Sequence, residues 1–455
     1  MPSPRLRALP LLSLGLVAVV LVWAVRLPAV TWKSAQPPRH VILISLDTLR
    51  ADHLGAWGYE GETSPRLDSL AKKSVVFRRA VAQGSSTIPS HASLFTSQYA
   101  SAVIAPGAGL LDWSETLAEA LSLDGFATWG FVDGGNVRSR FGFDRGFEHY
   151  EDDRVGVERL VARAKGWITS HPTPRFFLFL HTYEIHTPYK APPEYVKMFG
   201  TPEFRPGFHP DTKYFREIEA QGKGLSAREH REVVARYDAG IRYTDERIGG
   251  FLDWLDERGL LQDSLVVVVS DHGEEFLEHG RLGHQQLYLD PNLRVPLLFY
   301  RRGMPARVID ETVELIDVVP TILDLLELPN LPASVGQSLV ASFAGVPPRG
   351  DRMAYAEKGT MPGAQTVITD RYQLLEDRTT NEVRLYDLQA DPEATRDVLA
   401  EQPAVAAELA AAMAARREAA SESWHRHERE ARRQTRIAPM KDKVRRELEV
   451  LGYLE

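Results

Sequence analysis

Five short runs of aliphatic and aromatic residues constrain the fold of this chain most strongly. They cover residues 40–46, 126–132, 175–181, 264–270 and 295–300. Continuous apolar runs of this length are typical of parallel strands that are buried on both faces. Segments with helical periodicity lie between them, at 114–121 and at 235–255, and each is followed by a glycine. This alternation predicts an α/β fold with a mostly parallel central sheet covered by helices.

The length of 455 residues predicts more than one structural unit, because single cores stop growing at roughly 250–300 residues. We expect residues 40–345 to form the main α/β domain. Beyond them, alternating runs at 372–376 and 382–387 flank a polar turn and predict an antiparallel hairpin. An Ala-, Glu- and Arg-rich segment at 403–432 predicts a surface helix, so residues 346–455 are interpreted as a small C-terminal α+β subdomain.

Residues 1–39 are interpreted as a membrane anchor or signal segment followed by a tether. Arg5 and Arg7 precede a mostly apolar stretch at residues 8–25, which approaches the roughly 17–25 residues of a membrane span. This charge placement predicts that the main domain lies outside the cytoplasm, in the periplasm or extracellular space. No clean cleavage site precedes Trp32, which favours an uncleaved anchor over a secreted protein with a cleaved signal; a buried N-terminal helix is a third alternative.

Composition excludes several classes of function. The net charge of −8 argues against a general nucleic-acid binder, because such proteins grip phosphates with clustered Lys and Arg. The chain has no cysteine, which removes disulfides, thiolate metal ligands and any cysteine-derived catalytic group. The polar stretch at 199–231 is interpreted as a cap over the site or as a flexible insertion. Nothing in the sequence specifies an oligomeric state.

Acidic residues follow two of the predicted strands. Asp47 comes directly after the run at 40–46, and Asp271 and His272 end the run at 264–270. Ligands of open α/β sheets bind beyond the carboxyl ends of the strands, so these side chains are expected to converge. Carboxylates bind hard cations, and an imidazole beside a carboxylate is common around Mn or Zn. They predict a metal site, although Asp47 taken alone is equally well explained as a helix N-cap.

Thr87 stands two residues before Pro89, where a helical segment begins. Its hydroxyl is therefore expected at a helix N-terminus, where free N–H groups favour a phosphate, a sulfate or an anionic oxygen. On local grounds an ordinary threonine N-cap is the competing interpretation.

The sequence at 87–96, TIPSHASLFT, resembles the signature of the sulfatase family within the alkaline-phosphatase superfamily. Further segments resemble family landmarks in the same order, at 46–55, 141–147, 186–189, 270–274, 317–323 and 385–392. The resemblance covers residues 40 to about 400 and implies an alkaline-phosphatase-like fold.

The resemblance also implies roles for individual residues. Asp47, Asp271 and His272 match metal ligands, and Thr87 matches a nucleophile that also contacts the metal. Thr48 occupies the position of a second Asp or a polar residue. One divalent ion, Ca²⁺, Mn²⁺ or Zn²⁺, is the expected cofactor.

Two histidines match positions that hold the anion or protonate the leaving oxygen. They are His186 and His284, and His284 stands where many sulfatases have Lys. A second ion would need Glu184, His186 and His284, whose spacing does not match the pattern of two-metal relatives, so a single ion is favoured.

The chain departs from the family pattern at two positions. Sulfatases carry Cys or Ser at the position of Thr87 and convert it to formylglycine, whereas oxidation of a threonine would give a ketone. No formylglycine is therefore expected, and Thr87 itself must attack, with the metal lowering the pKa of its hydroxyl. His91 stands in place of the usual Arg, and is expected to supply a weaker, pH-dependent positive charge.

The predicted function is a metal-dependent hydrolase of sulfate or phosphate-type esters that forms a covalent Thr87 intermediate. The substrate would be a small-molecule, glycan or lipid ester. A phospho-group transferase acting on a lipid or glycan is one alternative, although the single apolar segment argues against it. A non-catalytic binding protein with a sulfatase-like fold is the other.

Overall fold

The computed structural model describes residues 36–104, 109–200, 208, 210–284, 286–346, 352–358 and 363–434. Its main feature is an eight-stranded sheet with the order β10-β2-β9-β6-β1-β5-β3-β4. Five of these strands are β1 (His40–Leu46), β2 (Val75–Val81), β3 (Ala127–Val132), β4 (His149–Glu151) and β5 (Phe176–Thr182). The others are β6 (Ser264–Val269), β9 (Arg294–Tyr300) and β10 (Arg307–Glu314).

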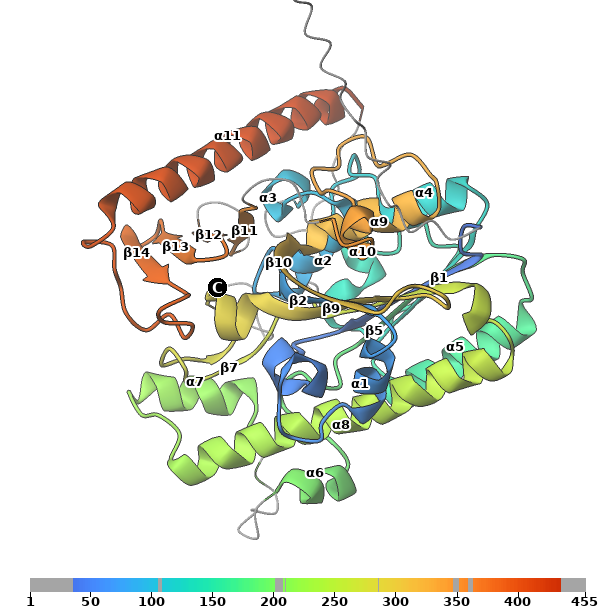
Figure 1. Ribbon diagram of the computed structural model, residues 1–455, viewed down its shortest axis with the longest axis horizontal. Helices are drawn as coiled ribbons and strands as arrows, with labels where there is room; N and C mark the ends of the chain where they lie inside the picture. The colour runs from blue at the N-terminus through green and yellow to red at the C-terminus, as the bar shows by residue number, and fades with distance from the viewer. Residues whose placement is uncertain are drawn as a thin grey trace, which may run out of the picture.

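Helices cover both faces of this sheet, as Figure 1 shows. One layer contains α2 (Thr87–Thr96), α3 (Ala100–Val103), α4 (Leu117–Leu123), α9 (Val318–Leu325) and α10 (Val340–Phe343). The opposite layer contains α1 (Pro65–Ala71), α5 (Val157–Ser170), α6 (Pro193–Phe199) and α8 (Ala227–Glu257), and α7 (Thr212–Ala220) lies near one end of α8. The predicted α/β fold with a mostly parallel, helix-covered sheet is confirmed.

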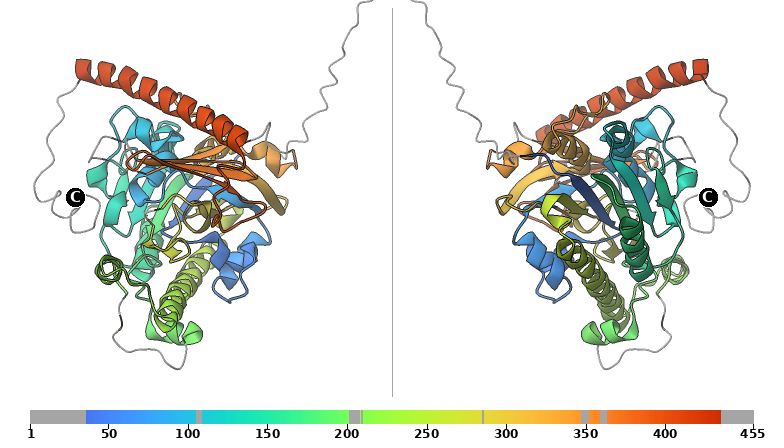
Figure 2. Two further views of the ribbon diagram at one scale, coloured as in Figure 1. Left: turned by 90° about the vertical axis from the view of Figure 1, so that its left-hand side faces the viewer. Right: turned by 90° about the vertical axis from the view of Figure 1, so that its right-hand side faces the viewer.

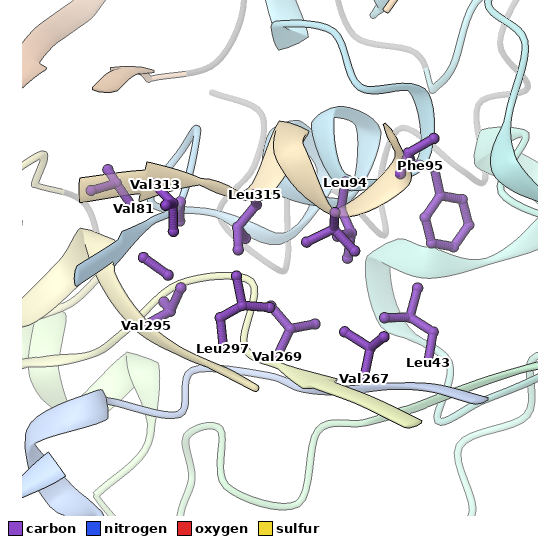
Figure 3. Close-up of a cluster of buried hydrophobic side chains, with 14 of the residues drawn as sticks. Leu43, Val81, Leu94, Phe95, Val267, Val269, Val295, Leu297, Val313 and Leu315 are labelled. Carbon is purple, nitrogen blue, oxygen red and sulfur yellow. The ribbon is translucent and has the colours of Figure 1, made fainter. Parts of the chain in front are cut away.

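The two cores follow from the alternation of side chains along each strand. In β1, Val41 and Leu43 point into one core, while Ile42 and Ile44 point into the other, and all are fully buried. Successive strand residues face opposite sides of a sheet, so a continuous apolar run fills both layers. Figure 3 shows Leu43 with side chains of neighbouring strands facing Leu94 and Phe95 of α2. This packing holds the helix that carries Thr87 against the sheet.

The C-terminal region forms a second, antiparallel sheet. Its strands are β11 (Ala354–Glu357), β12 (Ala364–Ile368), β13 (Tyr372–Asp377) and β14 (Glu382–Asp387), and the predicted hairpin is β13–β14. The long helix α11 (Pro403–Gln434) lies along this sheet (Figure 2) and buries Leu409 and Met413 against it. Two short strands, β7 (Glu275–Phe276) and β8 (Leu282–Gly283), pair near the site.

Some elements differ from expectation. The predicted run at 295–300 forms β9, but β9 is antiparallel to both of its neighbours, β2 and β6. Strand β2 was not predicted, because the exposed Arg78 and half-buried Arg79 interrupt its apolar pattern. Within the polar stretch at 199–231, the described residues form α7 and the first turn of α8. Serine 226 caps α8 through a capping box with Glu229.

No helix in the described ranges is both long and apolar enough to cross a membrane. The predicted anchor or signal segment at residues 8–25 lies outside the described residues.

Candidate active site

The carboxyl ends of β1 and β6 lie side by side, and each is followed by an aspartate. The two strands pair in parallel, so Asp47 and Asp271 emerge at the same edge of the sheet. The amide of Thr48 donates to Asp271 Oδ1 at 3.3 Å, and the amide of Leu49 donates to Ser270 Oγ at 2.9 Å. These hydrogen bonds fix the turn after β1 against the turn after β6.

Thr48 lies in the turn after β1 and adopts a left-handed backbone conformation, with φ of 56°. Its hydroxyl donates to the Asp47 carbonyl at 2.8 Å. Thr48 thus stabilises the turn, because its side-chain hydroxyl is hydrogen-bonded to the backbone. Tyr237 of α8 supports this turn, because its hydroxyl donates to the Thr48 carbonyl at 2.7 Å and accepts from the Arg50 amide at 2.8 Å.

Thr87 is the first residue of α2, and Ser86 occupies the N-cap position. The competing interpretation of Thr87 as an N-cap therefore does not apply. The Thr87 hydroxyl is fully buried and donates to Asp47 Oδ2 at 3.3 Å. One turn into the helix, the Ser90 hydroxyl donates to the Asp271 carbonyl at 2.5 Å. The N-terminus of α2 is thereby attached to the ends of both β1 and β6.

The buried side chains around this junction fit a divalent cation. One ligand atom each from Asp47, Asp271 and His272 lie within 4.8 Å of one another. All three residues are fully buried, and Asp47 Oδ1, Asp271 Oδ2 and His272 Nε2 have no hydrogen-bond partner. The ring N–H at His272 Nδ1 donates to the Gly273 carbonyl at 2.9 Å, which leaves the Nε2 lone pair free for a metal. Unpaired buried polar atoms are costly, and an ion would satisfy all three.

The electrostatics of the two aspartates also favour a cation between them. Burial and the neighbouring Asp271 raise the pKa of Asp47 well above its usual range. Burial opposes ionisation of Asp271 as well, but the nearby His272, His91 and His181 lower its pKa to about 2. Two carboxylates this close resist ionising together, and a divalent ion removes that repulsion.

His91 is fully buried, one turn of α2 beyond Thr87. Its Nδ1 donates to the Thr87 carbonyl at 2.9 Å, and its Nε2 lies 2.9 Å from the Ser45 hydroxyl. Burial lowers the pKa of His91. The neutral imidazole is therefore favoured, which argues against the pH-dependent positive charge expected from the sequence.

His186 and His284 stand beside this cluster. Their rings are 5.2 Å apart, and the His284 ring is 4.5 Å from that of His272. His284 Nδ1 lies 3.1 Å from Glu274 Oε1, and this carboxylate raises the pKa of His284 although burial opposes it. His186 donates from Nδ1 to the Thr187 carbonyl at 2.7 Å, and burial lowers the pKa of His186 to about 4. His284 is thus better suited than His186 to carry a proton.

Two site residues were not singled out from the sequence. His181 lies in β5, where its Nε2 is 3.2 Å from Asp47 Oδ2, and Glu274 contacts His284. A signal for His181 was present, since it ends a predicted buried run just before the strand's carboxyl edge. Glu184, one of the residues considered for a second ion, instead accepts from the Val157 amide at the N-terminus of α5, at 3.1 Å.

Comparisons with known proteins identify the family and the fold. Residues 39–328 match the family model described as Sulfatase. An arylsulfatase of Clostridium perfringens (strain 13 / Type A) is 24% identical over 368 residues, which cover 65% of this chain and 76% of that protein. An ulvan-active sulfatase of Formosa agariphila is 28% identical over 364 residues, covering 69% of this chain and 67% of that protein.

Solved structures share the fold. The complex of BT4656 with D-glucosamine-2-N,6-O-disulfate superposes with a TM-score of 0.72 at 16% identity, covering 85% of this chain and 99% of that one. The phosphonate monoester hydrolase of Agrobacterium radiobacter gives a TM-score of 0.69 at 22% identity, covering 85% and 96%. With the family model matched over most of the central sheet, we conclude that this chain belongs to the sulfatase family and is an ester hydrolase.

Proposed function

We propose that the chain is a metal-dependent hydrolase of sulfate or phosphate-type esters that works through a covalent Thr87 intermediate. One observation carries this proposal: the Thr87 hydroxyl lies 3.3 Å from Asp47 Oδ2, at the N-terminus of α2 and beside Asp271 and His272. A divalent ion held by Asp47, Asp271 and His272 would neutralise charge on the transferring group and lower the pKa of the Thr87 hydroxyl.

In the first step, Thr87 Oγ1 attacks the sulfur or phosphorus atom. A new Thr87–O bond to that atom forms while the bond to the leaving alcohol breaks. The hydroxyl proton passes along the existing hydrogen bond to Asp47. The N–H groups of the first residues of α2, at the positive end of the helix dipole, would favour the anionic oxygens of the transferring group.

His284 completes the proton transfers. It is the group whose pKa is raised by Glu274, so it gives a proton to the leaving alcohol. In the second step water attacks the Thr87 ester, its proton returns to His284, and the Thr87 oxygen leaves and regains its proton from Asp47. The sum is one ester and one water converted to one alcohol and one acid. His186 has a buried Nε2 without a hydrogen-bond partner, and this nitrogen would hold the anion when the ring proton sits on it instead of on Nδ1.

The nucleophile bears on the choice between sulfate and phosphorus. A threonine oxygen cannot become the aldehyde from which sulfate is eliminated in formylglycine enzymes, so its ester must be resolved by a second displacement at sulfur or phosphorus. Phosphoryl centres tolerate two successive displacements well. The similarity to a phosphonate monoester hydrolase structure is compatible with phosphorus esters, whereas the complex with a disulfated glucosamine supports a sulfated glycan.

The proposal is tested with the purified full-length chain. An aryl sulfate, an aryl phosphate monoester and an aryl phosphodiester are offered separately, each with Ca²⁺, Mn²⁺ or Zn²⁺ after chelator treatment. Acid quenching followed by intact-mass measurement and peptide mapping is expected to find the transferred group on Thr87. Metal-independent turnover, or an adduct on another residue, would contradict the proposal.

A further inference from the structure

A second group of metal-binding side chains adjoins the first and shares Asp271 with it. One ligand atom each from His91, His181 and Asp271 lie within 4.8 Å of one another, and all three residues are fully buried. We propose that these residues form a second cation position next to the Asp47, Asp271 and His272 site. Asp271 would bridge the two ions, so the reactive centre would hold a metal pair.

Unpaired atoms support this second position. His181 Nδ1 and Asp271 Oδ2 are buried without a hydrogen-bond partner. Two imidazoles and a carboxylate are a ligand set that suits Zn²⁺ or Mn²⁺ better than Ca²⁺, which prefers oxygen ligands. The second position is therefore expected to select a transition metal.

Separations between the side chains point the same way. His91 Nδ1 is 3.4 Å from Asp271 Oδ2, which is longer than the N···O distance of about 2.7–3.2 Å in an N–H···O hydrogen bond. Neighbouring ligands of a tetrahedral ion with bonds near 2.1 Å are separated by about 3.4 Å. The spacing is thus that of ligands around an ion.

The hydrogen bonds of His91 can adapt to such an ion. Its Nδ1 now donates to the Thr87 carbonyl, and its Nε2 faces the Ser45 hydroxyl. Binding through Nδ1 would move the ring proton to Nε2, where the Ser45 oxygen would accept it. This hydroxyl would then orient the ligand, as partners of metal-bound histidines usually do.

The surroundings of His91 also suit a bound ion. Its ring contacts the edges or faces of Phe95, Phe143 and Phe179, at 6.1–6.3 Å between centroids. Water competes weakly with ligands in such an apolar shell. In addition, His91 stands where the sulfatase signature usually has Arg, so the second ion would supply the positive charge that the imidazole does not.

The inference rests on the first cation site of the proposed function, and metal content separates the two. The purified full-length chain is stripped with a chelator, reloaded with Zn²⁺ or Mn²⁺ and desalted, and ions per chain are counted by mass spectrometry. Two ions are expected for the wild type and one for His181→Leu and His91→Arg. The matched control is His40→Leu, which removes a buried histidine at the far end of β1 and should retain two ions.

Folding is monitored by circular dichroism, and His181→Gln provides a milder variant. In the Mn²⁺-loaded protein, electron paramagnetic resonance should show a spin-coupled pair in the wild type and an isolated ion in the His181 variants. A wild type that never holds more than one ion, or a folded His181 variant that holds as many as the wild type, would overturn the inference. Metal content and the resonance signal do not depend on turnover. If the wild type held two ions but formed no Thr87 adduct, the second cation position would stand and the proposed Thr87 intermediate would be disproved.

Discussion

Glu274 Oε1 lies 3.1 Å from His284 Nδ1, and both side chains are buried beside the predicted metal ligands. The carboxylate orients the imidazole and raises the pKa of His284. Because Nδ1 is engaged, Nε2 is the nitrogen to which the proposed function assigns the proton for the leaving group. This pair resembles in its logic the carboxylate–imidazole pairs that orient general acids and bases in other hydrolases.

Glu274→Gln should shift the pH dependence of kcat/KM toward lower pH. An acid must be protonated to act, so activity declines as pH rises through the pKa of His284. Glutamine preserves an oxygen that can face Nδ1 but removes the charge, which lowers that pKa and moves the alkaline limb to lower pH. Glu275→Gln is the control, since Glu275 instead accepts from the amides of His279 and Arg281. An unmoved alkaline limb in Glu274→Gln would disprove this role.

Two replacements of Thr87 should show how much its hydroxyl contributes to turnover and how much its methyl group contributes. Thr87→Ala is expected to lower kcat by at least about 10³-fold, because the bond-forming oxygen is lost. Thr87→Ser retains an oxygen at the same place and should stay within about tenfold of the wild type. Steady-state rates and intact-mass spectra of quenched samples measure both effects. Turnover by Thr87→Ala at the wild-type rate would exclude Thr87 as nucleophile.

Metal removal should destabilise the fold, and more so at high pH. An ion present at about a thousand times its Kd stabilises the folded state by about 4 kcal/mol. Without it, Asp47 must ionise while buried beside Asp271, and its raised pKa means that stability is lost as pH rises. Thermal unfolding with and without chelator should therefore differ more at pH 8 than at pH 5. Asp47→Asn should reduce both the chelator effect and its pH dependence.

Glu357 predicts a separate pH effect on stability at the C-terminal sheet. This residue of β11 is 2% exposed and accepts from the Ser101 amide at 2.6 Å, and burial raises its pKa from 4.5 to about 7. A carboxyl with a raised pKa favours folding when protonated, so its contribution is lost between about pH 4.5 and 7. Between pH 5 and pH 8, the Glu357 carboxyl should lower the free energy of unfolding of the wild type by on the order of 2–3 kcal/mol, and Glu357→Gln should abolish this drop. Urea unfolding at both pH values measures the difference. Glu382→Gln, at an exposed position of β14, should leave the free energy of unfolding unchanged at both pH values.

Much of the fold could be predicted because the buried strands have a distinctive pattern. The run at 40–46 matches β1, and the aspartates at the ends of β1 and β6 are neighbours because those strands pair. The direction of β9 could not be predicted, since an apolar run contains no information on the polarity of its partners. Strand β2 was hidden by Arg78 and Arg79 near the sheet edge.

The candidate site was predicted less completely than the fold. Asp47, Asp271 and Thr87 were detectable because each stands at the boundary of an element. In the sequence His181 is one member of a buried run, and a strand pattern does not reveal which member faces a carboxylate in three dimensions. The partner of His284 likewise depends on the short β7–β8 hairpin, which pairs Glu275 with Gly283 and so brings the adjacent residues Glu274 and His284 together.

Strands β6, β1 and β5 are consecutive in the sheet, and the residue pairs Ser45–Val269 and Ser45–His181 are in register. The reactive groups at their ends are therefore anchored in the least deformable portion of the molecule. Segments at the periphery can be lengthened, shortened or rewritten without displacing those groups. Related proteins can therefore change their substrate preference by altering peripheral loops while the residues at the ends of these strands keep their positions.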